Sequence, residues 1–212
     1  MKGNGMNLAI QRTKAFYERH AKTYLQGRDP YFLDEEIGHF AYFFLQYQDK
    51  KGELLDIGCA NALRYPSLKL HLSHTRYVGA DIAQAFITMA QERYPCIDFY
   101  LSDITDWDIL PQKQFAGVWC SSVLQHIPEE LFAVALSNLY RLLLPGGVAY
   151  ISLPTSHVAG NPNDTRHFTI FSPEEQREWL HRAGFKILYT GETQGFQSPD
   201  VWKTYIVRRD LH

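Results

Sequence analysis

The sequence predicts an α/β fold: a doubly wound, seven-stranded mixed sheet with helices on both faces and a helical segment before it. Three observations support this prediction. Residues 52–57 form a short apolar run that breaks into a turn of small residues and then into a helical pattern, which is the first half of a βαβ unit. Similar strand and helix patterns alternate after it. The last two apolar runs, at 185–190 and 202–208, predict a hairpin with one antiparallel strand.

Each element follows from its local pattern. Apolar and aromatic residues at helical spacing predict two helices before the sheet, at 13–25 and 32–48. Helices between the strands are predicted at 63–72, 84–93, 129–144 and 173–183. The third of these is expected to stop at Pro145-Gly146-Gly147, and the last to start at an N-cap, Ser172. The remaining strands are predicted at 77–81, 97–101, 115–120 and 148–153.

Size and composition indicate a single domain, 1–212. The chain has 212 residues, of which 45% are hydrophobic, enough for one sizeable core, with 1–48 as a helical lid and 50–208 as the sheet domain. The net charge of -2 gives no sign of a nucleic-acid or membrane surface, and no apolar run predicts a signal peptide or membrane span. Cys59, Cys96 and Cys120 lack metal-ligand spacing and are expected to be reduced and buried. We therefore predict a cytoplasmic protein without a metal.

Acidic residues at the ends of two successive strands predict a ligand site. Asp56 ends the first strand and precedes the turn Gly58-Cys59-Ala60, and Asp81 ends the second. Turns at the carboxyl ends of parallel strands bind nucleotides, and an acid at the second strand end binds a ribose diol. No phosphate-binding motif is present and no lysine follows until Lys69, so the site should attract a cation. S-adenosylmethionine fits, because it has a ribose, an adenine, an ammonium and a sulfonium but no phosphate.

At this turn the chain resembles the class I (seven-stranded, Rossmann-like) S-adenosylmethionine-dependent methyltransferases, whose first motif is a strand ending in acidic-x-Gly-x-Gly. Residues 56–60 match except for Ala60 at the second glycine, and Ala62 replaces a further frequent glycine. An alanine at positive φ costs roughly 1 kcal/mol relative to glycine. Leu-Leu-Pro-Gly-Gly at 143–147 is a second family signature, and the resemblance covers residues 50–208. The alternative is an ordinary strand-to-helix turn without a cofactor.

The resemblance implies a set of cofactor contacts. It places Asp56, Gly58, Cys59 and Ala60 at the first turn, Asp81 and Ile82 at the ribose, Asp103 and Ile104 at the adenine, the backbone of Cys120 and Ser121 beside the methionine moiety, Gln125 at the cofactor on its acceptor side, and Tyr17, Tyr24 and Arg28 in the lid. Structural roles remain open for several of them. Asp81 also fits a helix N-cap, Asp103 a turn residue, and the lid tyrosines aromatic packing.

The acceptor contacts are expected on two segments. His126 follows the fourth strand, and Arg166 and His167 lie in the long segment 154–172. His126 or His167 would serve as the base if the acceptor needs its proton removed, whereas a carboxylate or an amine would need none. A structural role at a helix start is equally compatible with His126, and an ordinary surface loop with Arg166 and His167.

Three functions remain open. A methyltransferase acting on a small molecule is the first. The second is an enzyme similar to the methyltransferases that esterify carboxymethyl-uridine at the tRNA wobble position, which a basic patch of Arg28, Arg64, Arg166, Arg208 and Arg209 would favour. The third is a non-catalytic binding or regulatory protein, suggested by Ala60, Ala62 and Ala116. The acceptor atom, the pathway and the oligomeric state are not determined by the sequence.

Overall fold

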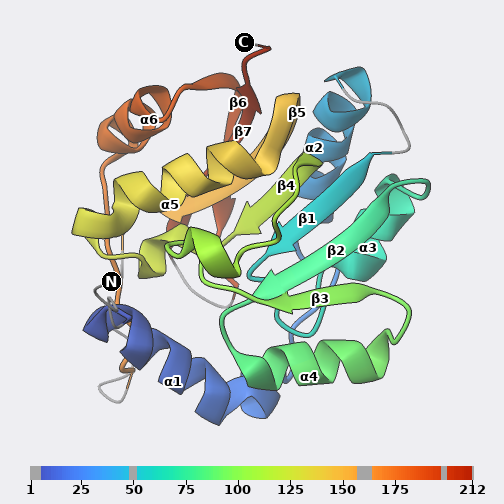
Figure 1. Cartoon of the computed structure of the whole chain (residues 1–212). Coiled ribbons are helices and arrows are strands. Elements are labelled where there is room, and N and C mark those ends of the chain that lie inside the picture. Colours follow the sequence, from blue (N-terminus) through green and yellow to red (C-terminus); the bar gives the residue numbers. More distant parts are fainter. Residues whose placement is uncertain (1–5, 48–51, 157–163, 197–199, 212) are drawn as a thin grey trace.

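Seven strands form one mixed sheet in the order β3-β2-β1-β4-β5-β7-β6 (Figure 1). The computed structural model describes residues 6–47, 52–156, 164–196 and 200–211. Its strands are β1 (Glu53–Ile57), β2 (Arg76–Asp81), β3 (Asp98–Leu101), β4 (Phe115–Ser121), β5 (Leu143–Pro154), β6 (Phe185–Gln194) and β7 (Val201–Arg209). Only β7 runs antiparallel to its neighbours, β5 and β6. The predicted mixed sheet with one antiparallel strand is therefore confirmed.

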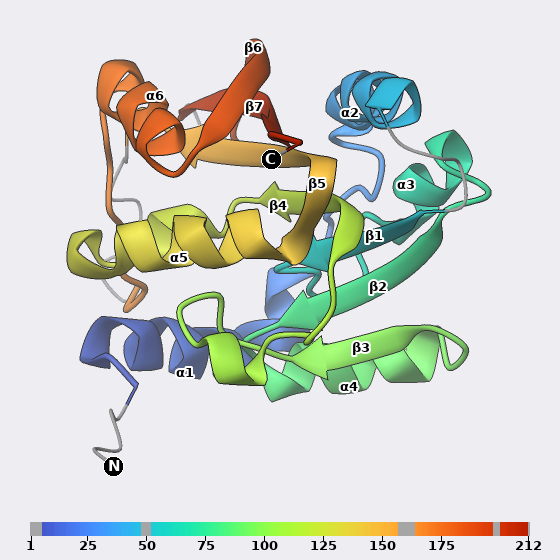
Figure 2. The ribbon, with the colours of Figure 1, turned by 45° about the horizontal axis from the view of Figure 1, so that its top comes forward.

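Helices cover both faces of this sheet, as Figure 2 shows. On one face lie α2 (Asp34–Tyr47), α3 (Tyr65–His71) and α4 (Gln84–Arg93), over a core that includes Phe40 and Trp119. On the other face lie α5 (Glu129–Leu142) and α6 (Pro173–Arg182), around Phe132 and Leu180. The N-terminal helix α1 (Leu8–Tyr24) packs on α4, with Ala21 against Phe86. This places α1 beside the carboxyl ends of the central strands.

Capping side chains explain where the helices begin. Helix α1 starts at Leu8 instead of residue 13, because the side-chain oxygen of Asn7 accepts a 2.8 Å hydrogen bond from the Ala9 amide. Helix α6 starts after Ser172 as predicted, in a capping box with Glu175. Helix α2 begins at Asp34 with acidic residues in its first turn, which the helix dipole favours. Its predicted end at Gln48 lies outside the described residues, as do the loop residues Gly160 to Asn163.

The segment Pro145-Gly146-Gly147 does not separate helix from strand as expected. Strand β5 begins at Leu143, which already pairs with Phe115 of β4. Gly146 adopts a φ of 78°, and the register shifts between Phe115 and Gly117, so the strand continues through an irregularity. Strands β6 and β7 are also longer than predicted, because they pair with each other along their whole lengths.

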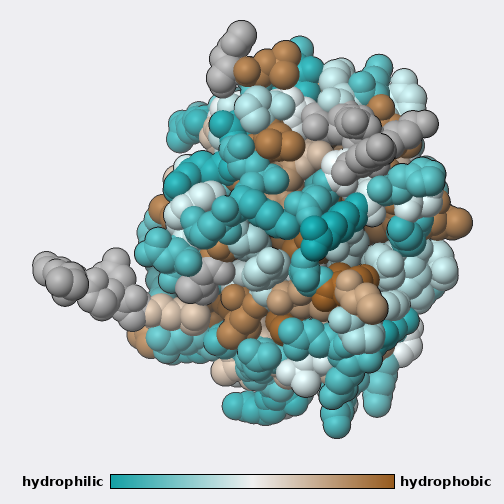
Figure 3. Space-filling model, turned by 45° about the vertical axis from the view of Figure 1, so that its right-hand side comes forward, coloured by the Kyte–Doolittle hydropathy of each residue, from teal (hydrophilic) through white to brown (hydrophobic). Residues whose placement is uncertain are grey.

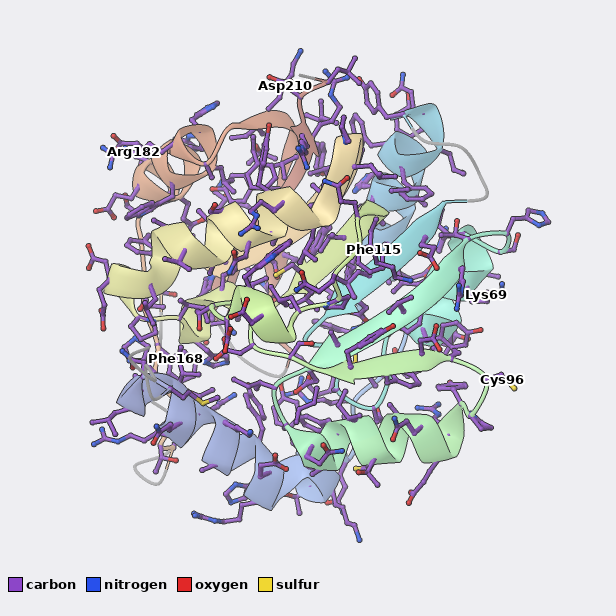
Figure 4. The ribbon with its side chains drawn as sticks, viewed as in Figure 1. Lys69, Cys96, Phe115, Phe168, Arg182 and Asp210 are labelled. Carbon is purple, nitrogen blue, oxygen red and sulfur yellow. The ribbon has the colours of Figure 1, made fainter. Side chains whose placement is uncertain are left out.

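The surface shown in Figure 3 is mainly hydrophilic, with apolar residues exposed in small groups. Cys96 is also exposed, and in Figure 4 it lies at the outer end of the turn between α4 and β3. The expectation that all three cysteines are buried is therefore wrong for Cys96, although Cys59 and Cys120 are buried free thiols. Among the described residues, no helix has the length and apolarity needed to span a membrane.

Candidate active site

A cavity of about 460 Å³ lies at the carboxyl edge of the sheet, where β1, β2 and β4 end. Residues of α1 and of the turn between β6 and β7 contribute to its lining. Most of the predicted contacts line it: Tyr17, Tyr24, Arg28, Asp56, Gly58, Cys59, Ala60, Asp81, Ile82, Asp103, Ile104, Ser121, Gln125, His126 and Arg166. The structure therefore gathers residues from all parts of the predicted site into one space.

Two predicted contacts are not part of this lining. Cys120 points into the core on the α5 face, because successive strand residues point to opposite faces and its neighbour Ser121 takes the cavity side. The His167 ring lies 2.9 Å from the Thr169 hydroxyl. The contacts of His167 with cavity residues are made by its backbone, whose amide donates to the Thr13 hydroxyl at 2.9 Å and whose carbonyl lies 2.7 Å from Nδ1 of His126. The expected roles of the His167 ring as a base and as an acceptor contact therefore do not fit its position.

The first turn brings the backbone close to the cavity. Gly58 has a φ of 76°, and a Cβ there would lie 2.3 Å from a methyl of Val123, so no other residue fits without rearrangement. The amide of Gly58 donates to the Ala80 carbonyl at 2.8 Å, which ties the turn to β2. Ala60 and Ala62 adopt φ values of 50° and 58°. The turn thus forms with alanines at positions where the family motif has glycines.

Asp81 joins the first turn to the start of α4. Its two carboxylate oxygens accept hydrogen bonds from the Ala60 amide at 3.0 Å and the Ala83 amide at 2.9 Å. Burial raises the pKa of Asp81 to about 6, although these amides oppose the rise. A carboxylate has about four acceptor positions, so lone pairs remain for a ligand. The N-cap alternative is not supported, because Ala83 is the N-cap residue and Glu18 of α1 accepts from the amides of Gln84 and Ala85.

Asp56 is the second buried acid of the cavity. It is 2% exposed, and the hydroxyl of Tyr77 donates to it at 2.7 Å. Burial raises the pKa of Asp56 to about 7, while the Tyr77 hydrogen bond and Arg64 lower it and Asp81 raises it further. Ionised Asp56 is therefore destabilised in the ligand-free site. A bound cation would stabilise the carboxylate by neutralising its charge.

Asp103 and Ile104 follow β3 at the edge of the same cavity. One carboxylate oxygen of Asp103 accepts from both the amide and the hydroxyl of Thr105, at 2.9 and 2.8 Å. This local turn agrees with the structural interpretation of Asp103. It engages one of the two oxygens, so a turn and a ligand contact are compatible at this residue.

Helix α1 is held over the cavity by a hydrogen-bonded chain. The Tyr17 hydroxyl lies 2.9 Å from Nε2 of His126 and accepts from Nη1 of Arg166 at 3.1 Å. Arg166 is paired with Asp164 at 2.6 Å and lies over the ring of Phe168, which Figure 4 places beside α1. The chain connects three segments that are far apart in sequence. It closes one side of the cavity.

The surroundings of His126 define its protonation. Nδ1 lies 2.7 Å from the carbonyl oxygen of His167, so Nδ1 carries the proton and Nε2 accepts from Tyr17. Gln125 lies 3.1 Å from the same Nε2 atom. Burial lowers the pKa of His126 to about 3, so the ring is neutral at physiological pH. Its lone pair is engaged and its protonated form is disfavoured, so this ring is poorly suited to accept a proton.

Several lining residues were not predicted, among them Thr13, Arg64, Trp119, Tyr150, Phe196 and Trp202. Trp119 had a usable signal, because it is two residues from Ser121 and so lies on the same side of β4. Tyr150 lies beside Trp119 on the neighbouring strand, and their rings stack with centroids 3.8 Å apart. Thr13, Arg64 and Phe196 reach the cavity only through tertiary packing, for which the local sequence has no signal.

The comparisons with known proteins agree with this geometry. A family model described as a methyltransferase domain matches residues 54–147. A curated relative, the trans-aconitate 2-methyltransferase of Variovorax paradoxus, is 31% identical over 132 residues, which are 62% of this chain and 48% of the relative. This chain thus spans about half the length of that relative.

Solved structures share the fold over nearly the whole chain. The 1,6-didemethyltoxoflavin-N1-methyltransferase of Burkholderia thailandensis, solved with S-adenosylhomocysteine, has a TM-score of 0.71 at 15% identity, with 95% of this chain and 88% of that chain covered. The magnesium protoporphyrin IX methyltransferase of Synechocystis PCC 6803 has a TM-score of 0.71 at 16% identity, with 95% and 100% covered. The chain thus contains a match to a methyltransferase domain over residues 54–147 and shares the Rossmann-like fold of these methyltransferase structures.

Proposed function

We propose that the protein transfers a methyl group from S-adenosylmethionine to a small-molecule acceptor. The observation that carries this proposal is the pair of buried acids, Asp56 and Asp81, in one cavity at the ends of adjacent strands. Burial raises the pKa of both carboxyl groups, so the cavity favours a ligand with positive charge and disfavours a phosphate.

The residues present fit this cofactor. Asp81 would hold the ribose diol with its remaining lone pairs, and Asp56 would face the ammonium. Asp103 and the backbone of Ile104 would hold the adenine. Gly58 lines the cavity at the first turn, where the missing Cβ lets Val123 pack against the backbone. S-adenosylmethionine supplies a methyl group on a sulfonium, which is already activated for displacement.

The protein's own contribution is alignment and the exclusion of water. Tyr17, His126 and Arg166 would serve this purpose by holding α1 over the cavity. We therefore assign His126 to positioning instead of proton acceptance. The cavity lining contains no second histidine among the described residues, so an acceptor that is already nucleophilic at neutral pH suits the site best.

The two alternative functions have less support. Arg208 and Arg209 lie at the amino end of β5, where Arg209 donates to the Leu143 carbonyl at 2.6 Å, whereas Arg28 and Arg166 line the cavity at the carboxyl end. The predicted basic patch for tRNA is therefore not assembled. The non-catalytic alternative rested on Ala60 and Ala62 in the first turn and on Ala116 in β4. Ala60 and Ala62 adopt left-handed backbone angles, so the turn keeps its shape, and Ala116 is buried in the core.

Calorimetry with S-adenosylmethionine and S-adenosylhomocysteine tests the cofactor. Asp81→Ala should weaken binding at least tenfold, on the order of 1.4 kcal/mol, because the ribose loses its acceptor. Asp98→Asn is the control, because Asp98 is an exposed acid at the amino end of β3, away from the cavity, where it pairs with Arg76. The proposal is wrong if neither cofactor form binds the wild type, or if Asp81→Ala binds as tightly. Circular dichroism checks that each variant is folded.

The acceptor can be sought with the same proteins. The name of the Variovorax relative makes trans-aconitate the first compound to assay. Formation of S-adenosylhomocysteine that depends on this compound, and that is lost in Asp81→Ala, would identify an acceptor. Turnover without any acceptor would instead indicate hydrolysis or contamination.

A further inference from the structure

The cavity continues beyond the acidic residues into an aromatic region. Trp119 and Tyr150 form its inner wall, 0% and 1% exposed, and Phe32, Phe196 and Trp202 also line it. The rings of Trp119 and Tyr150 stack with an interplanar angle of 8°. One apolar volume is thus enclosed by Phe32 just before α2, by β4 and β5, and by the β6–β7 hairpin. Aromatic walls of this kind suit a planar ligand.

Two donors in this region have no hydrogen-bond partner among the described residues. They are Nε1 of Trp119 and Nε1 of Trp202, and both are buried, whereas the Tyr150 hydroxyl interacts with the side chain of Ser152. An indole nitrogen can only donate a hydrogen bond. Buried polar groups are nearly always paired in folded proteins, so unpaired ones in a cavity point to a ligand. These donors require a ligand with acceptor oxygens.

Two guanidinium groups lie at the same end of the cavity. Arg28 stacks between the rings of Tyr24 and Phe196, at 4.0 and 5.0 Å, and its Nε donates to the Tyr24 carbonyl. Arg64 donates to the carbonyl of Asp29 at 2.7 Å. Within the described part of the chain neither forms an ion pair with a carboxylate, whereas Arg166, the third arginine of the cavity, is paired with Asp164.

The two guanidinium groups of Arg28 and Arg64 carry more positive charge than the single carboxylate of the cofactor can neutralise. Burial and the nearby Arg28 both lower the pKa of Arg64, which shows that the two guanidinium groups repel each other. S-adenosylmethionine carries a single carboxylate, so it can pair with one of them. Asp56 and Asp29 both attract Arg64, but neither carboxylate forms an ion pair with it among the described residues, and the charge of Asp56 would be matched by the cofactor ammonium. One guanidinium is left for a second anion.

We propose that the acceptor is a planar, conjugated carboxylate. One of Arg28 and Arg64 binds its carboxylate and the other binds the cofactor carboxylate, while the indole donors of Trp119 and Trp202 bind its remaining oxygens. This inference rests on the proposed function. A carboxylate is favoured over a phosphate because one guanidinium carries a single positive charge, which a carboxylate matches, whereas a doubly charged phosphate would add negative charge to a cavity that already holds Asp56 and Asp81.

Calorimetry on the protein saturated with S-adenosylhomocysteine tests this recognition. The probes are 2-naphthoate, 2-naphthamide and 2-naphthyl phosphate, which share one ring system. We expect naphthoate to bind at least tenfold more tightly than naphthamide, and more tightly than naphthyl phosphate. Equal binding of naphthoate and naphthamide would overturn the proposal, and preference for the phosphate would overturn the choice of carboxylate. Failure of S-adenosylhomocysteine itself to bind would instead refute the proposed function.

Variants locate the two anion sites. Of Arg28→Gln and Arg64→Gln, one should reduce S-adenosylhomocysteine affinity tenfold and the other should remove the preference for naphthoate. Arg208→Gln is the control, because Arg208 lies at the other end of β7 and faces Asp210. Trp202→Phe keeps an aromatic ring but removes the indole N–H donor. It should therefore weaken naphthoate binding about threefold and leave the affinity for S-adenosylhomocysteine unchanged. The proposal fails if both arginine variants keep the preference for naphthoate.

Discussion

Replacing Asp56 with asparagine should stabilise the ligand-free protein at neutral pH. Asp56 is buried against Tyr77, and burial raises its pKa from 3.8 to about 7. An acid whose pKa is raised in the folded state binds its proton more tightly there than in the unfolded state, so stability falls as the pH rises through the interval between the two values. The loss is absent below pH 4 and complete above pH 7.

The size of this effect follows from the shift. A rise of about 3 pH units corresponds to about 4 kcal/mol of unfavourable free energy at pH 8, at 1.36 kcal/mol for each unit. At pH 5 the destabilisation has accumulated only over the interval from pH 3.8 to pH 5, so it is roughly 1.5 kcal/mol. Asparagine cannot ionise and still offers an oxygen to the Tyr77 hydroxyl. The advantage of Asp56→Asn over wild type should therefore grow by about 3 kcal/mol from pH 5 to pH 8.

Urea unfolding of both proteins at pH 5, 6, 7 and 8 measures this difference. Asp81, whose pKa is raised to about 6, contributes to both proteins and largely cancels in the comparison. In thermal unfolding the added advantage at pH 8 corresponds to roughly 6–12 °C for a chain of this size. Asp98→Asn, at an exposed strand start, should show no such growth. An advantage of Asp56→Asn that is equal at pH 5 and pH 8 would refute the reasoning.

Three further predictions concern the cavity walls. Gly58→Ala should lower the free energy of unfolding by roughly 2–5 kcal/mol in urea, because its positive φ and its blocked Cβ position both oppose a side chain; Ala60→Gly, at φ 50°, should change it by less than about 1 kcal/mol. Glu18→Gln should weaken the contact of α1 with α4 by about 1 kcal/mol, seen as faster hydrogen exchange in α1, with exposed Glu92→Gln as the control. Calorimetric affinity for S-adenosylmethionine should rise between pH 5 and pH 7 and level off above, since binding a cation favours ionised Asp56, and Asp56→Asn should flatten this rise.

The parts of the fold that the sequence predicted are those that depend on local patterns. The alternation of strands and helices gives the doubly wound sheet, and parallel strands place Asp56 and Asp81 at one edge because both residues lie at or next to the carboxyl ends of their strands. The strand-to-helix turn after β1 also follows from its local run of small residues. These features need no knowledge of distant residues.

The role of His126 could not be predicted in this way. The sequence places it after the fourth strand, where a histidine suits a base. Its proton affinity, however, depends on burial under α1, and its lone pair on Tyr17, 109 residues earlier. The alternation of side chains along β4 directs Ser121 and Trp119 to the cavity and the Cys120 side chain to the core, so the contact expected of Cys120 through its backbone stays a prediction.

The acceptor side depends on the direction of one strand. Because β7 is antiparallel to β5, its first residues lie at the carboxyl edge of the sheet, and Trp202 pairs with Pro154 beside the cavity. The same reversal carries Arg208 to the opposite edge, where it pairs with Val148. The predicted hairpin already contained this information, since an antiparallel last strand must separate its two ends across the sheet. Applied in full, it moves the terminal arginines away from the cavity and brings the Trp202 indole to it, which weakens the case for the tRNA alternative and agrees with the small-molecule acceptor expected first.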